Sequence, residues 1–327
     1  MRFFKKSIVG IDMNCSQMHF VEVTGNRKAP IIQNAGQVFL PEDIIQEGKV
    51  INQEKFKNAL DELWRKSKIK SKEVVLGVSN TDVIMRFVTL PKMPPEKLLN
   101  LIKFQASDYM PVNIDDFELD YTIIGENINE SGSTYNVLLV AARKSMLYEF
   151  INAFDITRSS IKDIKSSVLV MDKVIPESYM DIVSVVVNLS LETCNILIMN
   201  KNLPVFARTV VLKDNLHREI DKMYKAYFDE VVDRIASFVG EEIRTSISYF
   251  QSQNRSVTID KIFLIGCACS NEHISKELRD YIGVNVEVIK PYENLYNDLS
   301  KQNKNINYDP TEYAVALSLA LHGLEDL

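Results

Sequence analysis

Residues 7–13 read Ser-Ile-Val-Gly-Ile-Asp-Met, and residues 182–189 read Ile-Val-Ser-Val-Val-Val-Asn-Leu. Each apolar run predicts a strand, and each is followed by a polar turn and a second apolar strand. A third extended segment follows in both places, at 31–40 and at 203–212. The repeated order predicts two equivalent strand-to-turn junctions, at 10–14 and at 187–190, and therefore a duplicated α/β fold.

The segments around these hairpins alternate between helical and strand patterns. An amphipathic helix is predicted at 52–68, with Phe56, Leu60 and Leu63 on one stripe. Buried strands are predicted at 74–78 and 262–266, a short strand at 284–288, and a long charged helix at 214–252. A loop rich in Asn and Lys is expected after 288 up to residue 309, followed by a final helix at 310–323 whose small residues favour close packing on a sheet.

Residues 83–160 interrupt this repeat with a pattern of their own. The order is a strand (85–90), a helix (96–109), a hairpin (117–124 and 135–141) and a second helix (145–154). This β-α-β-β-α order predicts a small sandwich with helices on one face of its sheet. We therefore expect a first domain at 1–82, rejoined by about 161–180 and the C-terminal helix 308–327, an inserted subdomain at 83–160, and a second domain at 181–307 that includes a helical part, 214–256.

The composition excludes several classes of protein. The chain has 327 residues, a net charge of −6 and 46% hydrophobic residues, which is typical of a soluble globular protein. Its mild acidity argues against a general nucleic-acid binder. The four cysteines (15, 194, 267 and 269) show no framework spacing, so a cytosolic location with reduced thiols is expected. The N-terminal basic residues lack a following cleavage site, and the apolar run 313–321 is too short to span a bilayer.

Taken in order, these segments resemble the actin/Hsp70/FtsA superfamily and, within it, the PilM family of type IV pilus assembly. The similar stretches are 9–12 with 21–23, 85–91, 104–111, 138–143, 262–266 and 312–317, which together cover nearly the whole chain. The resemblance implies an actin-like fold with two duplicated α/β domains and an FtsA-type insert. It also implies a cytoplasmic scaffold, held at the inner face of the membrane by its partner.

The partner implied by the resemblance is a PilN-like bitopic membrane protein, bound through its N-terminal cytoplasmic peptide. The scaffold would link the membrane alignment complex to the motor side of the pilus machinery; a contact with the motor ATPase and a homodimer stay open. The resemblance also implies that the peptide lies in a groove between the insert and the first domain, and extended peptides commonly bind in such grooves or at sheet edges. The residues expected there, each with a place in the core of the insert as its alternative, are Arg86, Leu90, Met93, Leu98, Ile102, Gln105 and Tyr109.

The superfamily also implies a nucleotide site at the two junctions and at the strand that ends at 266. Its expected residues are Asp12, Asn14, Cys15, Ser16, Asn188, Ser190, Gly266 and Cys267. Here Asn14, Cys15 and His19 replace the family's Gly, Ser and Lys, Asn188 replaces a magnesium-binding Asp, and one glycine of a Gly-rich run remains. The lost carboxylate is a ligand that Mg²⁺ prefers, and a neutral His removes a positive charge. We expect no ATP hydrolysis, and binding of ATP with Mg²⁺ stays open.

Other chemistry has weaker support in the sequence. Cys267 and Cys269 lack a second Cys or His pair at zinc spacing, so we expect them to be packing residues. Neither a Walker A, a GxSxG nor a dinucleotide-binding motif is present. Two alternatives to the scaffold remain: an active ATP-binding and hydrolysing protein of the same fold, and an FtsA-like filament-forming membrane tether. The second is disfavoured because little sequence follows Gly323 for an amphipathic tail.

Overall fold

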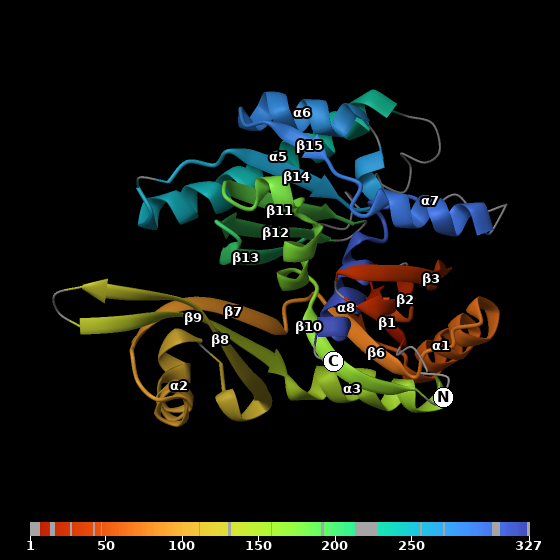
Figure 1. Ribbon diagram of the computed structural model, residues 1–327, viewed down its shortest axis with the longest axis horizontal. Helices are drawn as coiled ribbons and strands as arrows, with labels where there is room; N and C mark the ends of the chain where they lie inside the picture. Colours follow the sequence, from red (N-terminus) through yellow and green to blue (C-terminus); the bar gives the residue numbers. More distant parts are fainter. Residues whose placement is uncertain are drawn as a thin grey trace. The chain divides into compact units, whose positions relative to one another are not determined.

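The computed structural model describes residues 7–13, 17–26, 28–41, 43–46, 48–110, 112–129, 132–157, 159–190, 193–212, 228–255, 257–270, 272–302 and 308–325. The chain divides into two compact units. Unit 1 consists of Met1–Asn80 and Ala153–Leu327, and unit 2 consists of Thr81–Asn152. Figure 1 shows the elements of both units along the chain.

The first part of unit 1 is built on a five-stranded sheet with the order β10-β6-β1-β2-β3. Strand β1 pairs antiparallel with β2 and parallel with β6, while β2 pairs antiparallel with β3 and β6 parallel with β10. The elements of this part are β1 (Ser7–Met13), β2 (Gln17–Asn26), β3 (Ala29–Phe39), β4 (Ile45–Gln46), β5 (Lys49–Val50), α1 (Gln53–Ser67), β6 (Glu73–Val78), η2 (Asp155–Thr157), β10 (Ser160–Ser166), η3 (Leu169–Val174) and η4 (Glu177–Tyr179).

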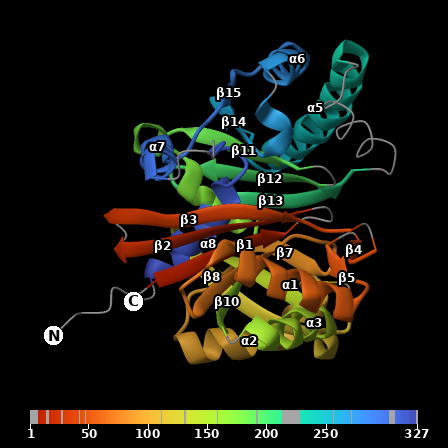
Figure 2. The same ribbon diagram turned by 90° about the vertical axis from the view of Figure 1, so that its right-hand side faces the viewer.

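The second part repeats this topology in a sheet with the order β13-β12-β11-β14-β15. Strand β11 pairs antiparallel with β12 and parallel with β14, as β1 does with β2 and β6. Helices α5 and α6 cover one face of this sheet (Figure 2). Its elements are β11 (Val183–Leu189), β12 (Thr193–Asn200), β13 (Leu203–Val211), α5 (Phe228–Gln253), β14 (Lys261–Ile265), η5 (Cys267–Ser270), α6 (Glu272–Ile282), β15 (Val286–Val288) and α7 (Glu293–Gln302), and they are followed in the chain by α8 (Ala314–Glu325). The duplication predicted from the hairpins is confirmed.

Helix α8 returns the chain to the first sheet, where it packs on β1, β2 and β6. The approach is close because glycine stands where β1 meets the helix. A Cβ on Gly10 would overlap the carbonyl oxygen of Ala316 and lie 2.5 Å from the backbone nitrogen of Ala320. The small residues of this helix and Gly10 therefore let two backbones touch.

Unit 2 is a three-stranded antiparallel sheet with the order β7-β9-β8, covered on one face by α2. Its core contains side chains of the helix (Leu98, Ile102) and of the central strand (Val137, Leu139). The elements are β7 (Val83–Pro91), α2 (Pro95–Tyr109), η1 (Ile114–Asp116), β8 (Phe117–Asn129), β9 (Gly132–Arg143) and α3 (Lys144–Phe154), whose last residues fall in unit 1.

Two predicted elements differ from the structure, and a third is described only in part. The segment after residue 288, expected to be a loop, contains α7, which buries Tyr296 and Leu299. The final helix begins at Ala314 rather than 310, because the Asp309 side chain accepts the backbone N–H of Thr311 and forms a turn before it. The long charged helix is confirmed from Phe228 onward, and residues 214–227 lie outside the described part of the chain.

Candidate functional site

The two strand-to-turn junctions each carry a row of three polar residues across neighbouring strands. In the first sheet Asp12 pairs with His19, which pairs with Gln37; we call these residues the first row. In the second sheet the equivalent residues are Asn188, Asn195 and Thr209, the second row. Because the strands repeat, the two rows occupy equivalent places in the two halves of unit 1.

Asp12 is the carboxylate of the first row. Its Oδ1 accepts a hydrogen bond of 2.7 Å from Ser167 Oγ, which lies just beyond the end of β10. Burial raises the pKa of Asp12 to about 6, and the bonds from Ser167 and the Met13 backbone offset only part of that effect. At neutral pH the Asp12 carboxylate is therefore ionised although it is buried away from water.

His19 is neutral in the folded chain. Its side chain is 4% exposed and stands edge-on to the ring of Tyr313, with centroids 5.3 Å apart. Burial lowers the pKa of His19 to about 4, although its hydrogen bond with Gln37 acts in the opposite direction. Its Nε2 finds no hydrogen-bond partner in the described structure. The first row therefore carries no cation at pH 7.

The second row is joined to the first part of unit 1 by hydroxyl groups. Asn195 Oδ1 accepts hydrogen bonds from Ser79 Oγ at 2.7 Å and from Thr209 Oγ1 at 3.0 Å, and the two hydroxyls lie 3.3 Å apart. Ser79 directly follows β6 of the first sheet, while Asn195 and Thr209 belong to the second. These side chains thus connect the two sheets at this point.

The second turn is bonded to itself. Ser190 Oγ lies 2.9 Å from Thr193 Oγ1, and its hydroxyl also interacts with the Thr193 backbone. Both residues are buried. Because the Ser190 hydroxyl already bonds within this turn, it is not free to donate a hydrogen bond to a bound ligand.

Gly266 ends β14 in a left-handed conformation, with φ of +104°. A Cβ there would overlap the Leu189 carbonyl oxygen and lie 2.5 Å from Asn188 Oδ1. Its N–H donates to the Thr311 carbonyl at 3.1 Å, and its own carbonyl accepts from the Cys269 N–H at the same distance. The turn therefore fits closely between the second row and the segment before α8, and only glycine fits there.

The cysteines around this turn are buried in the core of the second sheet. Cys267 directs its sulfur toward the Leu189 carbonyl at 3.9 Å, and Cys269 toward that of Ile265 at 3.0 Å. Burial raises the pKa of Cys194 to about 12 and also raises that of Cys269. The thiols of Cys194 and Cys269 are therefore neutral packing groups at pH 7.

Of the eight residues predicted at the nucleotide site, the structure brings four together at the second turn: Asn188, Ser190, Gly266 and Cys267. Asp12 lies in the first row, at the equivalent place of the other half. The other three, Asn14, Cys15 and Ser16, lie outside the described residues. Among the six residues of the two rows, Asp12 supplies the single carboxylate and no residue supplies a cation at neutral pH. These six residues therefore do not fit a magnesium triphosphate, which favours several anionic ligands for the metal and positive charge at the phosphates.

Replacing Asp12 by Asn is expected to stabilise the protein at neutral pH. The folded pKa of Asp12 is about 6, above the ordinary 3.8, so its ionisation disfavours the folded state as pH rises from about 4 to 6. Asn keeps an oxygen for the Ser167 hydroxyl without the charge. At pH 7 we expect Asp12→Asn to gain about 1–3 kcal/mol in the free energy of unfolding.

Urea unfolding of both proteins between pH 4 and pH 7 measures this gain. It should shrink as the pH falls from 6 and be nearly absent at pH 4. His19 is present in both proteins, so its opposite pH dependence cancels in the difference. A gain that is equal at pH 4 and pH 7 would contradict the burial of an ionised Asp12.

Unit 2 contains all seven residues predicted to contact a peptide, but in two different environments. Leu90, Leu98 and Ile102 are at most 1% exposed and belong to its hydrophobic core. These three residues therefore take the alternative place, in the core of the insert. The remaining four (Arg86, Met93, Gln105 and Tyr109) have side chains that reach the surface at least in part.

Three of those four residues form a hydrogen-bonded chain. Arg86 Nε donates to the Tyr109 carbonyl at 3.2 Å and its Nη1 to the Met85 carbonyl at 2.9 Å, while the Tyr109 hydroxyl donates to Gln105 Oε1 at 3.3 Å. The guanidinium thus ties β7 to the C-terminal end of α2. Its bonds to backbone carbonyls fix the position of Tyr109 and Gln105 at the surface.

Sequence reasoning missed Ser79, Asn195 and Thr209, whose contact depends on the pairing register of three strands. A signal was present in the repeat itself, since Asn195 occupies in the second hairpin the place of His19 in the first. Ser79 has no such signal, because it follows a buried strand as an ordinary polar residue.

Two features are absent from the described parts of the chain. No helix in the described parts of the chain is long and apolar enough to cross a membrane. Likewise, the described His, Cys, Asp and Glu residues include no group of three that could hold a metal ion.

Both the sequence and the structure of this chain are similar to those of known proteins. The sequence model of the family described as type IV pilus assembly protein PilM matches residues 10–235 and 217–324. A solved PilM-PilN type IV pilus biogenesis complex contains a chain of 22% identity that aligns over 97% of this chain and 98% of its own, with a TM-score of 0.78.

Two further solved structures are more distant. The ethanolamine utilization protein EutJ from Carboxydothermus hydrogenoformans is 11% identical over 96% of this chain and 89% of its own, with a TM-score of 0.51. A Bacteroides thetaiotaomicron protein of actin-like ATPase fold and unknown function is 11% identical over 88% and 94%, with a TM-score of 0.48. The duplicated sheets and the structural matches show the actin-like fold that was predicted.

Proposed function

The chain belongs to the PilM family of type IV pilus assembly proteins, and from this we propose that it is a scaffold of the pilus assembly machinery. Its partner is a PilN-like bitopic inner-membrane protein, bound through the N-terminal cytoplasmic peptide. The scaffold is cytoplasmic, stands at the inner face of the membrane through that partner, and couples the alignment complex to the motor side. The family match over almost the whole chain carries this proposal.

The peptide site of this proposal is the surface of unit 2 around Arg86, Gln105 and Tyr109. The Gln105 amide and the Tyr109 hydroxyl offer hydrogen-bonding groups for an extended backbone, and Met93 offers a flexible apolar contact. Arg86 acts as a positioning residue, since its guanidinium bonds to the carbonyls of Met85 and Tyr109. The core residues Leu98 and Ile102 support this surface from beneath.

We expect the peptide to bind with micromolar affinity and to lose about tenfold in affinity with Gln105→Ala, which removes a half-buried hydrogen-bonding group from the site. Isothermal titration calorimetry of the full chain with the N-terminal cytoplasmic peptide of the neighbouring bitopic membrane protein measures both values. Met93→Ala should weaken binding in the same direction through lost apolar contact.

Ser107→Ala is the matched control, because Ser107 is exposed on the same helix as Gln105. It should leave the affinity unchanged. If Gln105→Ala and Ser107→Ala bind like the parent protein, the peptide site is elsewhere. If the peptide does not bind at all, with or without Mg-ATP, the scaffold proposal fails.

The proposal includes a cleft without ATPase activity. His19 is neutral and buried, Asn188 is an amide, and the Ser190 hydroxyl is bonded within its own turn. A phosphate-release assay with Mg-ATP should therefore give no turnover above the Asp12→Ala variant. Turnover that Asp12→Ala abolishes would instead support the active enzyme of the same fold.

A further inference from the structure

Strand β15 is an edge strand of the second sheet, with β14 on one side. Odd-numbered residues at its two ends bond to β14: the Asn285 carbonyl accepts from Ile262 N at 2.8 Å, and Ile289 N donates to the Leu264 carbonyl at 3.1 Å. Because alternate residues of a strand direct their backbone groups to opposite sides, those of Val286 and Val288 point away from the sheet.

The outer edge is only partly occupied. Arg279 Nη2 donates to the Val286 carbonyl at 2.8 Å, which confirms that this carbonyl points outward. For Val288, no backbone hydrogen bond from the described residues reaches this outer side. The strand therefore presents an N–H and a C=O in the positions that a further strand would use.

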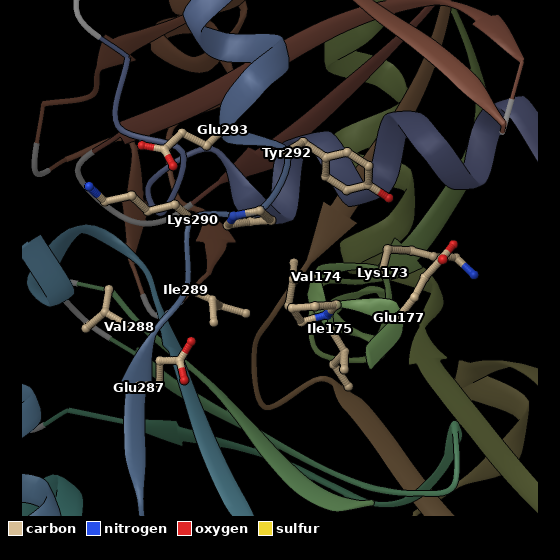
Figure 3. A pocket seen from close by; sticks show the side chains of 12 residues that line it. Lys173, Val174, Ile175, Glu177, Glu287, Val288, Ile289, Lys290, Tyr292 and Glu293 are labelled. Carbon is tan, nitrogen blue, oxygen red and sulfur yellow. The ribbon is translucent and has the colours of Figure 1, made fainter. Parts of the chain in front are cut away.

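A cavity lies on each face of this edge, and the two share Glu287, Val288 and Lys290. The first has a volume of about 650 Å³ and lies between residues 173–177 and 287–293. Figure 3 shows its apolar centre, where Ile289 faces Val174 and Ile175 across the slot, while the charged ends of Lys290 and Lys173 extend outward. This first cavity fits an aliphatic side chain.

The second cavity, of about 440 Å³, lies on the α6 side of the edge and is more polar. Arg279 and Lys290 bring positive charge to it. Of its two carboxylates, Glu287 forms an ion pair with Lys261, so the two cations of the cavity face one further carboxylate, that of Asp309, which accepts the N–H and hydroxyl of Thr311. Lys290 is exposed and makes no ion pair with the described residues, so this cavity favours an acidic side chain.

We propose that the outer edge of β15 binds an extended segment of a partner protein in which an aliphatic residue is followed by an acidic one. The segment pairs with the N–H and C=O of Val288 as an added strand. Its successive side chains point to opposite faces, so the aliphatic one enters the first cavity and the acidic one the second. This site lies wholly in unit 1 and does not depend on the proposed peptide site of unit 2.

A peptide of alternating valine and glutamate, eight residues long with blocked ends, is the probe. Titrated into the isotopically labelled full chain, it should shift the amide resonances of Val288 and Lys290 saturably and slow hydrogen exchange at Val288. A peptide of the same composition with four valines followed by four glutamates should bind at least about fivefold more weakly, because it cannot alternate between the cavities.

Lys290→Glu should weaken binding of the alternating peptide by about fivefold or more, since it reverses the free charge at the second cavity. The matched control is Lys276→Glu, which makes the same change on the exposed surface of α6 outside both cavities. Gln105→Ala in unit 2 should leave this binding unchanged, so failure here is distinguishable from failure of the proposed PilN-like contact.

Three outcomes would overturn the proposal. The first is equal affinity for the alternating peptide and for the peptide of four valines followed by four glutamates. The second is equal weakening by Lys290→Glu and Lys276→Glu, which would mean a nonspecific charge effect. The third is a set of shifted amides that excludes Val288, including the case in which the chain pairs with a second copy of itself and the peptide leaves this edge untouched.

Discussion

Gly10→Ala is expected to destabilise unit 1 by about 3 kcal/mol or more. The added Cβ would overlap the Ala316 carbonyl oxygen and come within 2.5 Å of Ala320 N and 3.0 Å of Leu319 Cβ. Two of these contacts are helix backbone, which cannot turn aside as a flexible side chain can. Helix α8 must therefore move away from β1, and the burial between them is lost.

The free energy of unfolding from urea titration measures the effect, with Gly125→Ala as the matched control. Gly125 lies in β8 of unit 2, and a Cβ there meets nothing closer than Asn136 Nδ2 at 3.5 Å. It should change stability by less than about 1 kcal/mol. Equal, small effects at both glycines would show that α8 does not rest directly on β1.

The second large effect is expected for Ile102→Ala, which should destabilise unit 2 by about 2–5 kcal/mol. Ile102 is fully buried between α2 and the sheet, in the same cluster as Leu98, Val137 and Leu139. Removing three carbons leaves a cavity that the surrounding strands only partly fill. Because the proposed peptide surface rests on this core, binding of the PilN-like peptide should weaken as unit 2 loosens.

Two further variants separate a core role from a contact role. Ile102→Val should cost only about 0.5–1.5 kcal/mol and leave peptide affinity intact. Ile123→Ala, at a side chain of the same sheet that is 42% exposed, should change stability little. If Ile102→Ala keeps the stability of unit 2 but loses the peptide, Ile102 contacts the peptide directly and its burial in the free protein is relieved on binding.

The parts of the fold that sequence predicted well are those with a strong local pattern. The helix predicted at 52–68 is α1, because Asn52 caps it by accepting the N–H of Lys55, and its stripe of Phe56, Leu60 and Leu63 is buried. The hairpins were equally clear, since apolar strands flank short polar turns. Where local pattern was weak, prediction failed: α7 buries Tyr296 and Leu299 among Asn, Asp and Lys residues that indicate a loop.

The site was less predictable, for two physical reasons. An amphipathic stripe has the same spacing whether it fills a core or lines a groove, so Leu98 and Ile102 could not be separated from Gln105 and Tyr109 by sequence. The contact of Ser79 with Asn195 and Thr209 joins residues more than a hundred positions apart. Such a contact depends on strand register and on the placement of two sheets, which no local pattern encodes.

The buried cysteines of the second sheet can serve as natural probes of how fast that part of unit 1 opens. Alkylating reagents attack the thiolate, and the burial that raises the pKa of Cys194 and Cys269 keeps both protonated and covered. Modification must therefore wait for the core around β12 and β14 to open. When the reagent is concentrated enough to react faster than the core recloses, the alkylation rate of these two sulfurs equals the opening rate, so the kinetic stability of this half can be followed without an engineered probe.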